Sequence, residues 1–280
     1  MKNIYPYMLQ LLDRSLAFRL LTSLVAAYLA LFIVGEIEAI HRHTSCWESV
    51  EFLACLRDEL TDLIAVENVE GFSILVVAIT YLIEGRDRQK QKHYEAWQVI
   101  DNAAAANVPT SNARIQALQD LNEDDVSLQE IDLPGADLKR IQLAGANLRE
   151  ATLNRTDLRN ANLQGANLQS ADLSESNLQN VDLSGANLEK ANFKGANLSH
   201  ANLCNTNLTC ANFRDAVLEG ANLSKALLIE SNLSAANLRS ADLRQANLRD
   251  AKLKESDFRS ADLKDAQLTG AIMPSGSVHE

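Results

Sequence analysis

The four cysteines of this 280-residue chain are its first candidates for chemistry, as disulfides, nucleophiles or metal ligands. They are Cys46, Cys55, Cys204 and Cys210. Their number and scatter exclude a disulfide framework, but Cys46 and Cys55 are nine residues apart and are a candidate disulfide if their segment lies in an oxidising compartment. We interpret Cys204 and Cys210 as free, reduced thiols.

Metal binding and catalysis need further groups at matching spacings. His41 and His43 lie close to Cys46, but this tight spacing fits no four-ligand pattern, so we predict no metal site. Residues 122–280 contain only two histidines, His200 and His279, and no serine, cysteine or carboxylate there has a base partner that its spacing predicts. The sequence therefore predicts no enzyme activity and no cofactor.

The net charge of −11 is shared by two halves that differ sharply in composition near residue 122. Residues 1–121 carry 10 basic and 15 acidic side chains, and residues 122–280 carry 16 and 22. Neither half is basic, and nucleic-acid affinity rests mainly on Lys and Arg that neutralise phosphates. The composition therefore disfavours a nucleic-acid partner.

Two apolar runs in the first half predict a transmembrane hairpin. Residues 20–34 carry no charge, and a helix that begins at Leu16 would be about 28 Å long, close to the thickness of a bilayer core. The second run, 72–83, reaches about 31 Å only if it begins near Leu63. That extension includes Glu67 and Glu70, which would mark an ion path if buried or else lie at the outer interface. A buried core helix is the alternative for this second run.

The charges that flank these runs predict their orientation. Lys and Arg precede the first run and directly follow the second, whereas residues 36–62 between them carry only Arg42 and Arg57 against seven carboxylates. The positive-inside rule then places both termini in the cytoplasm and the loop with Cys46 and Cys55 outside. We expect an integral membrane protein with two spans, in contact with membrane lipid.

Two further helices are expected before the second half begins. Residues 87–107 contain strong helix formers without Gly or Pro and predict a juxtamembrane helix that Pro109 ends. Ser111 can cap a short helix over residues 112–121. The apolar stripe of that helix, with Leu118 and Leu121, needs a partner, and the start of the second half is the nearest one.

The second half has a strict period of five. A large apolar residue recurs at every fifth position from Leu128 to Met273, with a small residue two positions before it, in 30 consecutive units over residues 126–275. A period of five fits neither a helix nor a strand, because it would spread the apolar residues over all faces. The chain must therefore turn once in each unit and point the leucine and the small residue inward.

The tandem pattern A-[DN]-L-x-x, as in Ala161-Asn162-Leu163-Gln164-Gly165, resembles the pentapeptide-repeat family. The resemblance implies an all-β fold, a right-handed quadrilateral parallel β-helix with four repeats per coil. Residues twenty apart would then stack, so Phe193 and Phe213 should touch. Glycines at the last position of several units, such as Gly135, would supply corners.

We predict four segments in all. Residues 1–85 form the hairpin, 86–125 the juxtamembrane and capping helices, 126–275 the β-helix and 276–280 a tail. The resemblance to cyanobacterial members of the family, which have similarly long and regular repeats, suggests a plasma or thylakoid membrane.

Two irregularities in the repeats are the candidate contacts for a partner. Leu227 and Ile229 stand at outward positions where Asn, Ser or Arg is usual. Six successive units also place a cation directly after the inward leucine or phenylalanine. These cations are Arg239, Arg244, Arg249, Lys254, Arg259 and Lys264. They are either a solvated face among interspersed aspartates or a surface for an acidic protein or anionic headgroups.

The function that we predict is a membrane-anchored scaffold that presents a rigid solenoid to a cytoplasmic or membrane protein. One alternative is a membrane sensor or transporter that acts through the hairpin as a homo-oligomer. The resemblance also offers a DNA mimic that binds gyrase. Three observations disfavour the mimic: Asn outnumbers Asp by 14 to 8 at the central position of the unit, six cations surround the last coils, and the C terminus is too short for a dimerising helix.

Overall fold

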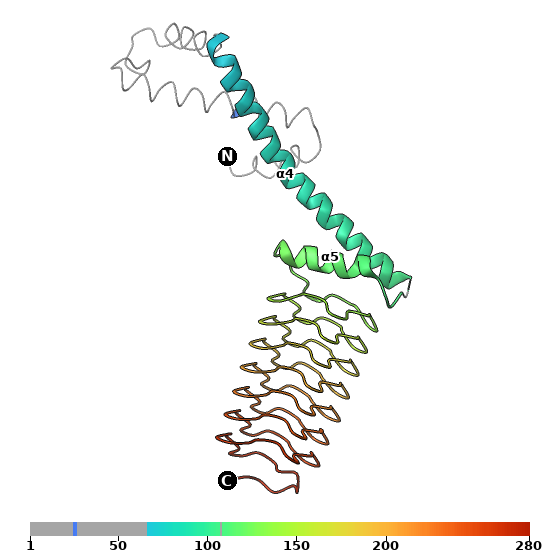
Figure 1. The fold of residues 1–280 in the computed structure, drawn as a ribbon, viewed down its shortest axis with the longest axis vertical. Coiled ribbons are helices and arrows are strands. Elements are labelled where there is room, and N and C mark those ends of the chain that lie inside the picture. The colour runs from blue at the N-terminus through green and yellow to red at the C-terminus, as the bar shows by residue number, and fades with distance from the viewer. Residues whose placement is uncertain (1–24, 27–65, 107) are drawn as a thin grey trace, which may run out of the picture. The chain divides into compact units, whose positions relative to one another are not determined.

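The computed structural model describes residues 25–26, 66–106 and 108–280 (Figure 1). The candidate disulfide of Cys46 and Cys55 and nearly all of the first predicted span lie outside these residues. The chain divides into two compact units, Met1–His93 and Tyr94–Glu280.

Helix α4 runs from Val66 to Ala105 and contains the second predicted span. It continues without a break through the predicted juxtamembrane helix. Within α4, Gly85 is the only Gly or Pro after Gly71, and the residues beyond it are strong helix formers. Within the ranges that the structure describes, no helix is long and apolar enough to cross a bilayer.

Helix α5, Asn112–Glu123, closes the beginning of the second unit. The Ser111 hydroxyl accepts the N–H of Arg114 at 3.1 Å, which confirms the predicted cap. Leu118 and Leu121 are fully buried against the first coil. Two amide side chains of α5 also bond to the backbone of that coil: Gln119 Oε1 accepts the N–H of Gln142 at 3.0 Å, and Asn122 Nδ2 donates to the Ala144 carbonyl at 3.1 Å.

The segment before α5 covers another side of the first coil. Thr110 forms a parallel bridge with Asp137, whose N–H donates to the carbonyl of Pro109. The buried Arg114 guanidinium donates to the carbonyls of Val108 and Pro109 at 3.2 and 2.5 Å and so holds this segment in place. Burial lowers the pKa of Arg114, and the nearby Asp137 carboxylate opposes that shift.

After α5 the chain winds into a solenoid of five-residue units. The central residue of each unit forms a parallel bridge with the residue twenty positions later, from Asp132 with Thr152 to Lys252 with Ile272. The predicted coil of four units is therefore confirmed. These bridges are isolated, so the described part of the chain contains no longer strand.

Three backbone hydrogen bonds per unit join neighbouring coils. In the unit of Leu128, the leucine N–H donates forward to Asn147 at 2.9 Å, and the N–H of Glu130 donates forward to Arg149 at 2.8 Å. The N–H of the central residue donates backward, as from Thr152 to Ile131 at 2.8 Å. A fourth bond closes the turn within the chain, from Ile131 back to Leu128.

The glycines predicted at corners, such as Gly135, do lie there, but other residue types also form corners. Every fifth residue from Glu130 to Gly270 has a φ between 56° and 77°, and most of them are not glycine. A left-handed residue costs about 1–2 kcal/mol. The hydrogen bonds to both neighbouring coils impose this conformation, so the side chain at the corner is free to vary.

Leucine columns with alanines beside them fill the solenoid. Phe193 and Phe213 lie in one column with their ring centroids 4.7 Å apart and their planes within 2°, which confirms the predicted contact. Where Ser or Thr replaces the alanine, its buried hydroxyl donates to the carbonyl three residues earlier, as Thr206 does to Leu203 at 2.7 Å. These polar side chains are thus satisfied without a partner elsewhere.

The segment predicted as a tail folds back at the end of the solenoid. Val278 forms an antiparallel bridge with Ile272, and the N–H of His279 donates to the carbonyl of Ala271 at 2.9 Å. The C terminus lies at the opposite end of the solenoid from α5 (Figure 1).

Candidate functional site

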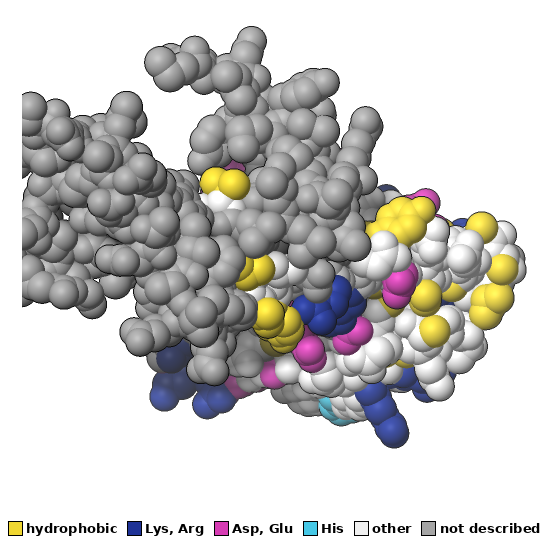
Figure 2. Space-filling model, turned by 90° about the horizontal axis from the view of Figure 1, so that it is seen from above, with side chains coloured by type: hydrophobic (Ala, Val, Ile, Leu, Met, Phe, Trp, Pro, Cys, Tyr) yellow, Lys and Arg dark blue, Asp and Glu magenta, His cyan; other side chains and the backbone are white. Residues whose placement is uncertain are grey.

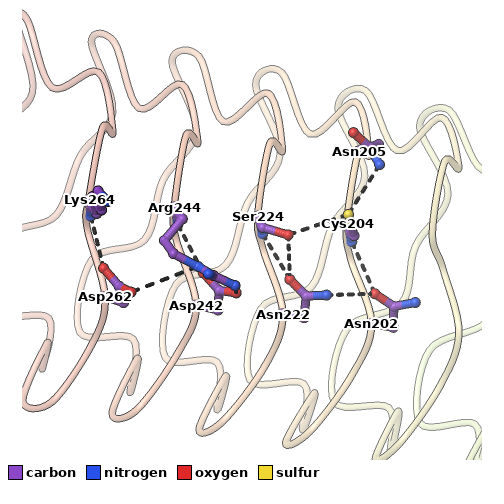
Figure 3. A network of polar contacts seen from close by, with 9 residues as sticks. All are labelled: Asn202, Cys204, Asn205, Asn222, Ser224, Asp242, Arg244, Asp262 and Lys264. Carbon is purple, nitrogen blue, oxygen red and sulfur yellow. Dashed lines mark hydrogen bonds and ion pairs between the residues drawn. The ribbon is translucent and has the colours of Figure 1, made fainter.

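Ladders of asparagine side chains run along the sides of the solenoid. Asn202 is typical: its Nδ2 donates to Asp182 of the preceding coil at 3.0 Å, and its Oδ1 accepts Nδ2 of Asn222 of the following coil at 3.2 Å. The same oxygen also accepts the N–H of Cys204, two residues later (Figure 3). An amide both donates and accepts in this way, whereas stacked carboxylates would repel one another. This explains why Asn is the usual central residue.

Several aspartates at the central position are neutralised within their own unit. The guanidinium two residues later donates to the carboxylate in Asp157–Arg159 at 2.7 Å, Asp242–Arg244 at 2.6 Å and Asp257–Arg259 at 2.5 Å. In the view of Figure 2, Lys and Arg side chains lie among Asp and Glu side chains on the described surface. These ion pairs offset the negative charge of the three aspartates.

The six predicted cations lie on all four sides of the solenoid, because they are five residues apart. Only residues twenty apart share a side, as Arg239 does with Arg259 and Arg244 with Lys264. Among the described residues, Arg244 and Arg259 are in ion pairs with aspartates, and Lys254 lies 3.5 Å from Glu255. The structure shows no ion pair for the side chains of the other three cations within the part of the chain that it describes. These three are Arg239, Arg249 and Lys264.

A shallow hollow of about 360 Å³ lies on the side that carries Arg244 and Lys264. Its other lining residues are Cys204, Ser224, Lys225, Gln245 and Asp265. Figure 3 shows the column at this hollow: the Ser224 hydroxyl contacts Cys204 Sγ at 3.4 Å, and Arg244 lies between Asp242 and Asp262. The sequence analysis missed Lys225. Aligning the sequence in rows of twenty would have placed it in the column of Gln245 and Asp265.

Leu227 and Ile229 lie on the next side of the solenoid. Leu227 is 44% exposed and stands where an asparagine would continue the ladder of Asn167, Asn187 and Asn207. Ile229 is half-buried beside it. Arg249 follows Ile229 by twenty residues, and the backbone of its coil bonds to Glu230. Of the predicted contacts, the structure thus brings Leu227, Ile229 and Arg249 together and places the other five on different sides.

Among the residues that the structure describes, the remaining chemistry-bearing side chains form no second cluster. Cys204 and Cys210 are free thiols, and Cys210 Sγ lies 3.6 Å from a carboxylate oxygen of Glu230. Burial, together with that carboxylate, raises the pKa of Cys210, so the thiol form is favoured. No group of three metal-ligating side chains occurs within the described ranges.

Comparison with known proteins accounts for the repeats. A family model for pentapeptide repeats matches in eight copies, between residues 124 and 234 and between 236 and 273, more than half of the chain. The chain belongs to the pentapeptide-repeat family. No curated protein matches the sequence.

Solved structures of other pentapeptide-repeat proteins also match. HetL of the cyanobacterium Nostoc sp. strain PCC 7120, a protein involved in heterocyst differentiation regulation, is 32% identical over 55% of this chain and 91% of its own, with a TM-score of 0.21. Rfr23 of Cyanothece 51142 is 31% identical over 41% and 64%, with a TM-score of 0.25. QnrB1, a plasmid-mediated fluoroquinolone resistance protein, is 17% identical over 52% and 73%, with a TM-score of 0.37. These scores are below 0.5, so the assignment of this pentapeptide-repeat protein to its family stands on the repeats.

The paired aspartates of this pentapeptide-repeat protein predict a loss of stability in acid. Hydrogen bonds from the Arg259 side chain lower the pKa of Asp257 from 3.8 to about 2, and Arg244 lowers the pKa of Asp242. Because the folded-state pKa is depressed, this contribution is complete above about pH 4 and is lost as the pH falls toward 2. Asp257→Asn keeps the acceptor oxygen but cannot titrate.

The measurement is the thermal unfolding midpoint of both proteins from pH 5 to pH 2. As the pH falls below 4, the unfolding midpoint of the wild type should fall by more than that of Asp257→Asn. A constant difference between the two midpoints at higher pH does not affect this comparison. A difference that does not change with pH would contradict the role of this ion pair.

Proposed function

We propose that this pentapeptide-repeat protein is a scaffold that binds a protein partner on the side of the solenoid that carries Leu227, Ile229 and Arg249. The observation that carries the proposal is the exposed Leu227, at which the asparagine ladder from Asn147 to Asn207 ends. An asparagine there would bond to both neighbouring coils, so the leucine forgoes hydrogen bonds that the fold offers. Such a loss at one position is understandable if the side chain contributes to binding.

The regularity of the remaining surface supports this position. Coils that repeat the same outward pattern offer a partner no unique place to bind, whereas an apolar pair next to an unpaired cation defines one. Arg249 lies on the same side as Ile229, and its guanidinium has no ion pair within the described part of the chain. We therefore expect a partner with an apolar contact and an acidic rim.

Attachment to a membrane is part of the proposal and rests on the sequence. Residues 20–34 are uncharged, and the cations that flank the two apolar runs favour cytoplasmic termini. The solenoid would then be held near the membrane while its sides stay accessible. Membranes with anionic headgroups would add to this attachment through exposed cations.

The test is affinity capture with full-length protein, followed by direct binding of the purified candidate partner. Leu227→Asn with Ile229→Ser removes the apolar pair and restores the ladder, so folding should be kept or improved while affinity falls by at least about tenfold. Arg249→Glu should weaken binding most at low salt, whereas Arg239→Glu, on another side, should not.

Unchanged affinity for the Leu227 and Ile229 variant would refute the proposed contact. The same experiment tests the anchor, because the full-length protein is expected in the membrane fraction. Recovery in the soluble fraction alone would contradict that part of the proposal.

A further inference from the structure

The two ends of the solenoid are closed to different degrees. At the N-terminal end, Leu118 and Leu121 of α5 cover the leucine columns, and the first leucines of those columns are almost completely buried. At the C-terminal end the columns finish in Phe258, Leu263 and Leu268, which are only partly buried. Their counterparts one coil earlier, Leu238, Leu243 and Leu248, are fully buried. The last coil therefore leaves an apolar end surface, although the hairpin around Gly276 covers one side of it.

The backbone of the last coil is also incompletely bonded. In the earlier coils, the N–H groups of the inward leucine or phenylalanine and of the corner residue donate forward to the next coil. In the last coil five such N–H groups have no acceptor within the described chain. They belong to Phe258, Ser260, Leu263, Asp265 and Leu268. Only three carbonyls, those of Ser256, Ala261 and Ala266, lack the donor that a further coil would supply. The C-terminal end thus has a surplus of hydrogen-bond donors.

The geometry limits what can occupy this end. The chain turns after every five residues, so an extended strand could pair with one side only and leave the other donors unmet. A second copy stacked end to end would bring five donors and three acceptors of its own, and the surplus of donors would double. Neither occupant satisfies the end surface.

The N-terminal end of the same solenoid shows how a helix can cover the leucine columns and bond to the edge of a coil. Helix α5 places two leucines three residues apart over the columns, and its amide side chains bond to the coil edge at 3.0 and 3.1 Å. We propose that the C-terminal end binds an amphipathic helix of a partner protein, with leucines at helical spacing and with Glu or Gln beside them. Carboxylate and amide oxygens are the acceptors that the donor-rich edge lacks, and carboxylates make the stronger bonds to N–H groups.

Lys264 adds to this complementarity. It belongs to the last coil, and its ammonium group has no ion pair among the described residues, whereas the nearby Arg259 is paired with Asp257. A glutamate of the bound helix could reach this cation. The interaction is separate from the lateral contact of Leu227 and Ile229, so either can exist without the other.

Two synthetic helical peptides test the proposal with the full-length protein. Both carry leucines at positions i, i+3 and i+7, and one has Glu and the other Lys beside the leucines. The Glu peptide should bind at least about tenfold more tightly than the Lys peptide, since lysine offers no acceptor. Binding should slow amide hydrogen exchange at the five unpaired N–H groups of residues 258–268.

A pair of matched variants locates the site. Leu263→Glu with Leu268→Glu places carboxylates on the end surface and should abolish binding of the Glu peptide, whereas Leu227→Glu, an equivalent change on the exposed side, should not. If the double variant fails to fold, hydrogen exchange in the wild type still shows whether the Glu peptide protects residues 258–268. Equal affinity for both peptides, protection elsewhere in the solenoid, or self-association that protects residues 258–268 without peptide would overturn the proposal.

Discussion

Leu203→Asp is expected to unfold the middle of the solenoid, whereas Leu227→Asp leaves it folded. Leu203 is fully buried in a leucine column, and Leu227 is 44% exposed. The buried variant loses the packing of the leucine and adds a carboxylate without a partner, at a cost of about 4 kcal/mol or more. Each coil contacts only its neighbours, so the damage should spread from the altered coil.

Urea unfolding of both variants, followed by circular dichroism, gives the comparison. The Leu203 variant should lose its cooperative transition or show a much lower midpoint. Similar midpoints for the two variants would mean that the inward and outward positions are wrongly assigned.

The stacked phenylalanines should be the next most sensitive positions. Phe213→Ala removes a fully buried ring that lies 4.7 Å from that of Phe193, and we expect a loss of about 3–5 kcal/mol. Phe258→Ala is the matched control, because the loss of this partly buried ring at the last coil should cost less.

A double-mutant cycle isolates the contact between the rings. Phe193→Leu and Phe213→Leu restore the usual residue of the column, and the coupling between them should be about 0.5–1.5 kcal/mol. Two results would refute the energetic role of the stack. One is that the losses in free energy of unfolding for Phe193→Leu and Phe213→Leu are additive, and the other is that Phe213→Ala and Phe258→Ala lose the same amount.

The solenoid was predictable because its signal is periodic. A strict period of five determines which residues point inward. The coil of four units, which the resemblance to the pentapeptide-repeat family implied, then brings Phe193 to Phe213. The corners were less predictable. Residues such as Lys190 and Glu230 adopt a left-handed φ that their own preferences disfavour, since the neighbouring coils impose it.

The side of the solenoid was harder to predict than its core. The sequence suggests that Asn202 is simply an uncharged outward residue, yet its amide bonds to residues twenty positions before and after it. Whether the side chains of Arg249 and Lys264 form ion pairs likewise depends on which carboxylates lie nearby in space. The fold-back of Val278 onto Ile272 involves no repeat at all, so the period gives no sign of it.

The register of twenty residues limits how insertions and deletions can alter the side of the solenoid during evolution. Deleting one five-residue unit between Ile229 and Arg249 would keep every leucine in the core but rotate all later side chains onto the adjacent side. Arg249 would then no longer lie beside Ile229. Gain or loss of four units at once would instead preserve every alignment while lengthening or shortening the rod. Duplications that conserve a binding surface should therefore accumulate in whole coils, even though the core itself would tolerate any number of units.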